Sequence, residues 1–110
     1  MKPLSPIDAA RSAIATNPER PATAVIHDTD DLRLVVFRLA PGQSVPPHRS
    51  VSSVMLTVLE GDGTLSGDGE EKQCSTGDVV TYDPNELHGM RAGTVDFLLL
   101  ATITPRPGSR

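Results

Sequence analysis

The feature that most constrains this chain is the steady alternation of short apolar runs with glycine and proline. The 110 residues include nine glycines and ten prolines, and most of them separate apolar runs of only a few residues. Glycine permits tight turns and proline interrupts long regular elements, so this spacing favours many short strands joined by turns. Clusters of Asp and Gly at 27–31 and 66–70 supply turn chemistry between neighbouring strands. We therefore predict an all-β fold.

The apolar runs define the predicted strands. Two of them, 32–39 and 54–59, are apolar on nearly both faces, as expected for strands buried between two layers or inside a closed barrel. Alternation with period two predicts that Val54, Leu56 and Val58 face inward. The predicted strands are 22–27, 32–39, 44–50, 54–59, 63–67, 71–75, 78–82, 88–92 and 95–103.

The amino terminus differs from the rest of the chain. Ser5 can cap a short helix that has Pro6 at its first position, and the sequence "NPERP" at 17–21 would end it. The residues that would share one face of this helix are Ile7, Ala10, Arg11 and Ile14. We expect an N-terminal arm at 1–21, a short helix or an extended segment, then a barrel at 22–104 and a flexible tail at 105–110.

In the last strand, Leu98 and Leu100 lie on the face opposite Phe97. Two interpretations stay open for this leucine pair. The N-terminal segment covers it, or two copies of the chain meet there across a two-fold axis.

Charge and cysteine content exclude several classes of function. Lys and Arg number 10 against 14 Asp and Glu, and the basic residues are scattered, so neither nucleic acid nor a membrane surface is an expected partner. No apolar run approaches the roughly 18 residues of a membrane span, and we expect a cytoplasmic protein. The single cysteine, Cys74, cannot form an internal disulfide, and we interpret it as a buried, inert thiol.

Two segments resemble the paired motifs of the cupins. In the first, Gly42, His48 and Gly61 stand at the family's spacing, but Ser50 replaces the second histidine and Val54 replaces the glutamate. This resemblance implies a double-stranded β-helix, the jelly-roll barrel of the RmlC-like cupins.

The second motif begins at Gly77 and retains His88. Pro84 lies one residue later than the family's proline, Asn85 replaces the turn glycine, and Ala92 stands in place of asparagine. Asparagine tolerates the left-handed backbone of a turn glycine, so the turn should persist. The chain looks like the small, single-domain, uncharacterised cupins. Because the family includes dioxygenases, isomerases, decarboxylases, storage proteins and effector-binding modules, the fold does not fix an activity.

The resemblance implies a metal position lined by residues 48, 50, 54 and 88. Only His48 and His88 keep ligand side chains there, which leaves a divalent Zn, Ni, Fe or Mn ion one protein ligand short. The candidates for a third donor are Glu60, Cys74, Tyr82, Asp83 and Glu86. Three interpretations stay open: a bound metal, two residual hydrogen-bonded imidazoles, or a functional pocket without metal.

Loss of the glutamate also favours an apolar or aromatic ligand with one polar group at the histidines. We predict a small-molecule-binding cupin, and a homodimer. The predicted pocket residues are His48, Ser50, Val54, Leu56, Tyr82, His88 and Met90. The alternatives are a dioxygenase-like metal enzyme, and a metal-free isomerase or epimerase with His48, Asp83 and Tyr82 in roles similar to those in the sugar epimerases of the superfamily. Whether the protein is an enzyme is left open.

We expect His27 to be a solvent-facing residue beside a turn.

Overall fold

The computed structural model describes residues 1–108, which form one short helix and nine strands. None of the helical structure in this part of the chain is long and apolar enough to cross a membrane. The elements are α1 (Pro6–Ser12), β1 (Ala22–Asp28), β2 (Arg33–Leu39), β3 (Ser44–His48), β4 (Ser53–Glu60), β5 (Asp62–Gly67), β6 (Glu70–Ser75), β7 (Val79–Tyr82), β8 (His88–Ala92) and β9 (Phe97–Thr104).

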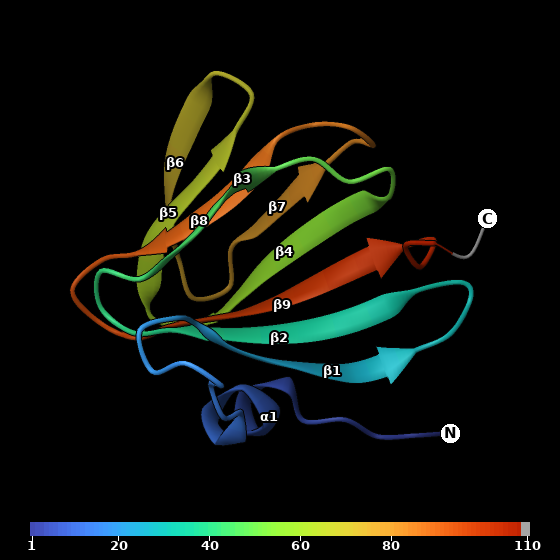
Figure 1. Ribbon diagram of the computed structural model, residues 1–110, viewed down its shortest axis with the longest axis horizontal. Helices are drawn as coiled ribbons and strands as arrows, with labels where there is room; N and C mark the ends of the chain where they lie inside the picture. Colours follow the sequence, from blue (N-terminus) through green and yellow to red (C-terminus); the bar gives the residue numbers. More distant parts are fainter. Residues whose placement is uncertain (109–110) are drawn as a thin grey trace.

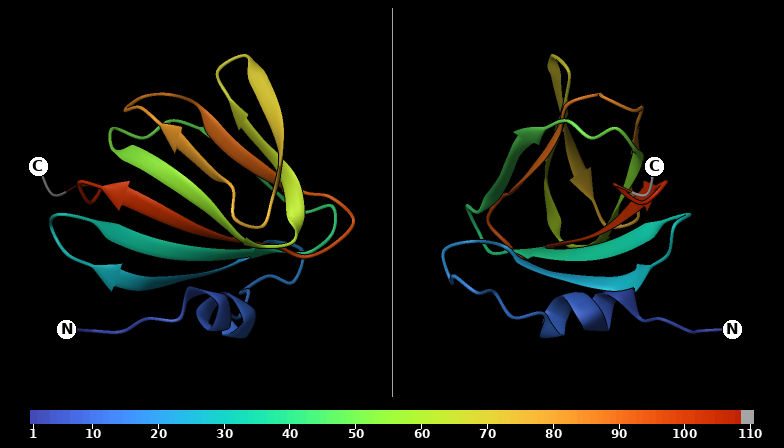
Figure 2. Two further views of the ribbon diagram at one scale, coloured as in Figure 1. Left: turned by 180° about the vertical axis from the view of Figure 1, so that it is seen from behind. Right: turned by 45° about the vertical axis from the view of Figure 1, so that its right-hand side comes forward.

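The strands form two antiparallel sheets that face each other (Figures 1 and 2). The large sheet has five strands in the order β1-β2-β9-β4-β7, and the small sheet has four in the order β3-β8-β5-β6. The chain passes between the sheets several times, as in a jelly roll. The predicted all-β, jelly-roll fold is confirmed, and each predicted strand range overlaps one observed strand.

The main core fills the space between the two sheets. On β4, Val54, Leu56 and Val58 are all buried there, which confirms the predicted inward set. β5 approaches its neighbours very closely at Gly63, because a Cβ atom there would lie 2.5 Å from the Arg91 carbonyl oxygen and 2.6 Å from the Phe97 ring. The buried residues of this core are Leu39, Val54, Leu56, Val58, Leu65, Cys74, Tyr82, Met90, Ala92, Phe97, Leu99 and Ala101.

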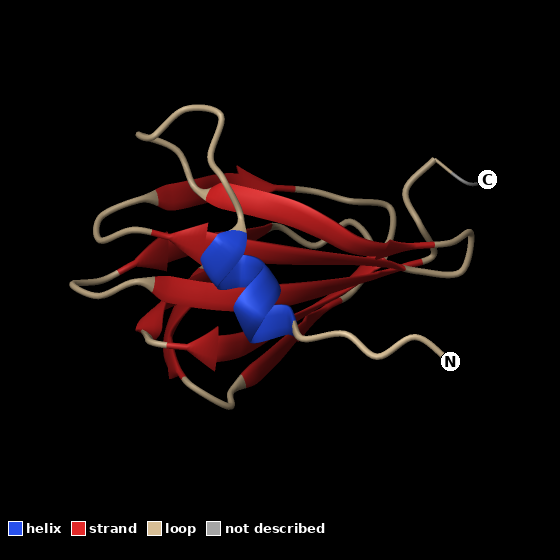
Figure 3. Cartoon of the chain, turned by 90° about the horizontal axis from the view of Figure 1, so that it is seen from below, coloured by secondary structure: helices blue, strands red, loops and turns tan. Residues whose placement is uncertain are grey.

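Helix α1 covers the outer face of the large sheet (Figure 3). Ala10 packs there against Val36 and Leu98, which are buried, and Leu100 borders the same cluster. The first interpretation of the leucine pair, coverage by the N-terminal segment, is therefore confirmed. The residue that fixes the helix is Arg38, whose Nη1 donates to the carbonyl oxygens of the last helical turn.

The helix ends before the last residue of its predicted face, Ile14. It ends at Ser12 and Ala13 is already extended, so Ile14, which is 86% exposed, lies outside the helix and the prediction that it shares the helical face is wrong. The carbonyl groups of Ala10 and Arg11, which lack partners within the helix, accept hydrogen bonds from Arg38 of β2.

The first residues after β9 contact the body of the protein. The hydroxyl of the fully buried Ser52 donates to the Pro105 carbonyl at 2.6 Å, and Arg106 lies 3.5 Å from Asp30 and 3.8 Å from Asp28. The tail was expected to lack packing contacts, and this is wrong for Pro105 and Arg106. Flexibility of 105–110 stays a prediction, and residues 109–110 lie outside the described part of the chain.

Candidate functional site

The two motif histidines meet on neighbouring strands. His48, the last residue of β3, lies directly opposite His88, the first residue of β8. Their ring centroids are 4.2 Å apart and the ring planes meet at 62°, an edge-to-face arrangement. The predicted convergence of these residues is present in the structure, at the end of the small sheet.

A β-bulge aims His48 at its partner. Val45 pairs with Met90 and His48 pairs with His88, so β3 spans three residues where β8 spans two. In a regular strand, Val45 and His48 would face opposite sides. The extra residue at Pro46 and Pro47 turns His48 to the side of Val45. The period-two pattern does not predict this bulge, although the Pro-Pro pair indicates a departure from regular pairing.

The two imidazoles differ in burial but share one hydrogen-bonding pattern. His88 is only 6% exposed, whereas His48 is exposed. Nδ1 of His48 lies 3.1 Å from the Pro46 carbonyl oxygen, and Nδ1 of His88 lies 3.3 Å from that of Glu86. Because a carbonyl oxygen can only accept, both Nδ1 atoms carry the proton, and Nε2 is the acceptor of each neutral ring.

Burial controls the protonation of His88. Removal from water lowers the pKa of His88 below its ordinary value of 6.5, and the neighbouring His48 lowers it further. The Glu86 carbonyl and carboxylate act in the opposite direction but do not reverse the shift. The ring of His88 is therefore neutral at neutral pH.

Tyr82 fills the space beneath His88. It is 4% exposed, pairs with Val54 across β7 and β4, and its ring centroid lies 5.3 Å from that of His88. Its hydroxyl donates to the Ser66 carbonyl oxygen at 2.9 Å, which links the large sheet to the small one. Burial raises the pKa of Tyr82 to about 12, so the phenol keeps its proton.

Ser50 lies in the loop that follows β3. It follows the end of β3, and its hydroxyl accepts the Ser52 backbone N–H at 3.1 Å. Its carbonyl accepts the N–H of Asn85, whose φ of 69° is the left-handed conformation that the sequence predicted. The prediction that Ser50 would continue the strand with His48 is wrong, because β3 ends at His48.

The remaining predicted pocket residues belong to the packed core. Val54, Leu56 and Met90 are 5%, 1% and 4% exposed, so almost none of their surface borders a space that holds water. The structure therefore brings His48, His88 and Tyr82 together over a filled barrel interior. The accessible surface of the site is its rim, at His48 and the exposed edge of His88. His27, for which we expected a solvent position, is partly buried on β1.

The donors around the pair do not fit a metal held by protein ligands. The Ser50 hydroxyl already accepts a hydrogen bond, Val54 has no donor atom, and the Tyr82 phenol keeps its proton. Glu86 accepts the Asp83 N–H, and Glu60 pairs with Arg11 on the other side of the large sheet. Residues 1–108 contain no group of three or more His, Cys, Asp or Glu side chains that could hold an ion.

Cys74 also adds no third metal ligand to the two histidines. It is buried in β6, as predicted, and burial raises the pKa of its thiol. Two imidazoles alone fall short of the three protein ligands typical of catalytic zinc and of the two-His, one-carboxylate set of non-haem iron.

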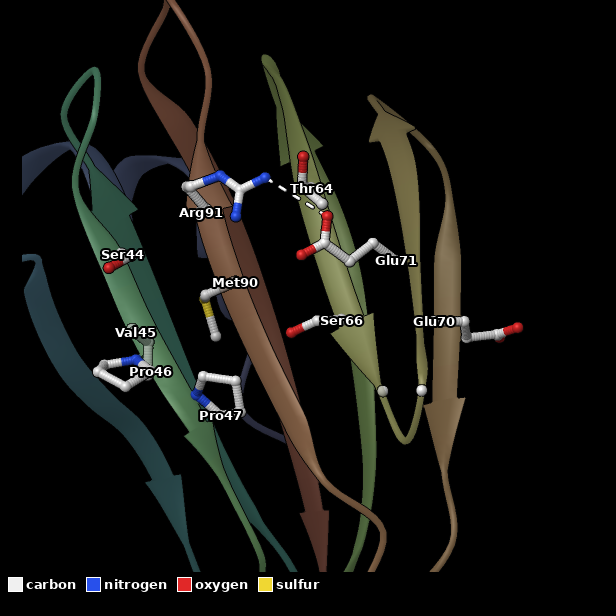
Figure 4. A pocket seen from close by; sticks show the side chains of 12 residues that line it. Ser44, Val45, Pro46, Pro47, Thr64, Ser66, Glu70, Glu71, Met90 and Arg91 are labelled. Carbon is white, nitrogen blue, oxygen red and sulfur yellow. Dashed lines mark ion pairs between the residues drawn. The ribbon is translucent and has the colours of Figure 1, made fainter.

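A second hollow, which the sequence did not indicate, lies on the opposite face of β8 (Figure 4). It has a volume of about 630 Å³, and Arg91 at one end lies 3.6 Å from Glu71. Both Met90 and Arg91 of β8 line this groove, and neither His88 nor His48 is among its lining residues. The groove also borders Pro46 and Pro47, which directly precede His48.

Comparison with known proteins places these features in a family. The cupin domain model matches residues 35–102. A search of curated proteins found no match. Among solved structures, an RmlC-like cupin from Desulfovibrio desulfuricans is 29% identical, with a TM-score of 0.76 over 86% of this chain and 91% of that one. The protein TT1209 from Thermus thermophilus is 25% identical, with a TM-score of 0.80 over 88% and 94%. KdgF from a Halomonas species is 23% identical, with a TM-score of 0.78 over 86% and 88%, and shows the fold alone.

Proposed function

Because the chain belongs to the cupin family, we propose that it is a small-molecule-binding cupin whose ligand contacts His48 and His88 at the rim of the barrel. The observation that carries this proposal is the cross-strand pair itself, with ring centroids 4.2 Å apart. Both Nδ1 atoms bond to backbone carbonyls, which leaves Nε2 of each ring for a ligand. A bulge that aims an exposed histidine at a buried one has no evident packing benefit.

The ligand in this proposal is a small organic molecule with an apolar or aromatic body and one polar group. The polar group meets the imidazoles, and the body lies along the rim rather than inside the filled barrel. Val51, in the loop between β3 and β4, is an exposed apolar side chain available to such a body.

The two enzymatic alternatives have weaker support. A dioxygenase-like enzyme needs a metal, and the donor set near His48 and His88 lacks a third protein ligand within residues 1–108. A metal-free epimerase needs an acid beside its histidine base, but the Tyr82 hydroxyl is bonded to Ser66 and its raised pKa makes it a poor proton donor. Asp83, the other candidate, is exposed after β7.

A fragment screen followed by NMR of the histidine rings tests the proposal. We expect fragments with millimolar or better affinity to shift the ring signals of His48 and His88, and His48→Ala to abolish these shifts. His27→Ala is the matched control, because His27 lies on β1 in the other sheet, and it should bind as the wild type does. A diverse screen in which no fragment moves either ring signal would rule out the proposed site.

A further inference from the structure

The hydrogen-bonding pattern of the histidine pair restricts which polar group it can recognise. Each Nδ1–H is used by a backbone carbonyl, at 3.1 Å for His48 and 3.3 Å for His88. A neutral imidazole has one donor and one acceptor, so the atom left for a ligand on each ring is an acceptor, Nε2. Nε2 of His88 has no hydrogen bond within residues 1–108. It is also absent from the buried polar atoms that lack a partner, so it belongs to the small part of His88 that solvent reaches.

Acidic side chains lie on the turn that leads into His88 and on the β5–β6 hairpin. Asp83 and Glu86 lie in the turn between β7 and β8 that leads into His88, and Asp68 lies at the tip of the β5–β6 hairpin. The Glu86 carboxylate is directed toward that hairpin, because a Cβ atom on Gly67 would lie 3.6 Å from its Oε2.

The basic side chain next to the pair in the sequence is already engaged. Nη1 of Arg49 donates to the Asn85 carbonyl at 2.6 Å, and Nη2 lies 3.6 Å from Asp68. The rim therefore offers acceptor nitrogens beside a turn that carries Asp83 and Glu86, which favours a cationic donor over an anion.

We propose that the His48–His88 pair binds a primary ammonium group, so that the ligand of this protein is a small organic amine with an apolar body. This inference rests on the proposed function, since it names the polar group of the ligand at the same site. An ammonium has three N–H donors and no acceptor, so it can donate to both Nε2 atoms at once. A carboxylate has only acceptors and would face two acceptor nitrogens.

Three probes with one ring and different polar groups test this inference: benzylamine, benzyl alcohol and benzoate. We would titrate each into the uniformly ¹⁵N-labelled protein at neutral pH and follow the ring nitrogens by long-range ¹H–¹⁵N NMR. The expected result is protonated Nδ1 and unprotonated Nε2 on both rings, with Nε2 signals that move on addition of benzylamine. Benzylamine should bind at least roughly tenfold more tightly than benzoate, a difference of about 1.4 kcal/mol.

Matched variants locate the binding event. His48→Ala should remove benzylamine binding, whereas His27→Ala should leave it unchanged. Benzoate binding at the pair as tightly as benzylamine would overturn the ammonium inference and leave the proposed function standing, because a ligand would still occupy the site. No movement of either ring with benzylamine would also overturn the inference. The wider fragment screen then decides the proposed function separately.

Discussion

The site depends on a single extra residue in β3. Without the bulge at Pro46 and Pro47, His48 would face away from Val45 and could not reach His88. Sequence spacing indicated that the two histidines belong to one site, but it also placed Ser50 on the same strand face. The strand ends before Ser50, and the Ser50 carbonyl bonds to the Asn85 N–H instead. Family spacing therefore located the histidines. It could not predict the role of Ser50, which depends on local hydrogen bonds that a period-two pattern does not reveal.

Acid should destabilise the folded protein through His88. Its pKa is lowered by burial in the folded state, so below pH 6.5 the unfolded chain binds more protons than the folded one. The stability contributed by neutral His88 is fully present above pH 6.5 and is lost as the pH falls through the folded-state pKa. Urea unfolding over this pH range should show a flatter profile for His88→Gln than for the wild type. A slope for His88→Gln equal to that of the wild type would refute the assignment.

Restoring the missing ligand types should create a metal site. We expect Ser50→His combined with Val54→Glu to raise the affinity for nickel or zinc about a hundredfold or more, because two donors would join the existing imidazoles. Competition with a chromogenic chelator measures this. Val51→His with Met55→Glu is the matched control, since both positions are exposed. Equal affinities for the two double variants would mean that residues 50 and 54 do not approach the histidine pair.

The strands were largely predictable, whereas the end of the helix and the filled barrel depend on residues far apart in the sequence. Period-two patterns placed Val54, Leu56 and Val58 correctly, because burial on one face leaves a clear alternation. The helix ends before Ile14, and its last carbonyl groups bond to Arg38, a partner too remote in the sequence for a local pattern to indicate. The filled barrel was also missed, since sequence patterns identify which residues face inward but not whether Tyr82 leaves space among them.

The contact of β5 with β8 and β9 makes Gly63 essential to the sheet packing. Gly63→Ala should lower the free energy of unfolding by about 1–3 kcal/mol, because the added methyl group overlaps the Arg91 carbonyl and the Phe97 ring. Gly93→Ala is the control, since its nearest neighbour atom, on Asp62, is 3.5 Å away, and it should change stability by about 0.5 kcal/mol or less. Equal losses in urea unfolding would contradict the close approach.

At the scale of the whole molecule, the four sheet edges differ in how well they are protected. β3 carries Pro46 and Pro47, β7 has only four residues, and β6 begins with the charged residues 70–72. β1 has seven residues, no proline and no Asp, Glu, Lys or Arg before Asp28, and its Val25 is 56% exposed. With the leucine face covered by α1, β1 is the edge best suited to pair with a second copy.

We therefore predict a homodimer that forms through β1. Light scattering coupled to gel filtration should give twice the chain mass for the wild type. Val25→Lys should yield the monomer, because it places like charges at a two-fold contact. Val79→Lys, a similar change on the exposed part of β7, should remain dimeric. A monomeric wild-type protein at micromolar concentration would contradict this prediction.

The account as a whole depends on two imidazoles that meet at the rim of a filled barrel. A crystal structure of the protein soaked with an amine fragment tests this most directly, because the map reveals both rings and whatever lies against them. We predict rings about 4 Å apart, each Nδ1 on its backbone carbonyl, and fragment density against Nε2. Rings turned apart toward solvent, or a fragment bound only elsewhere, would contradict the account.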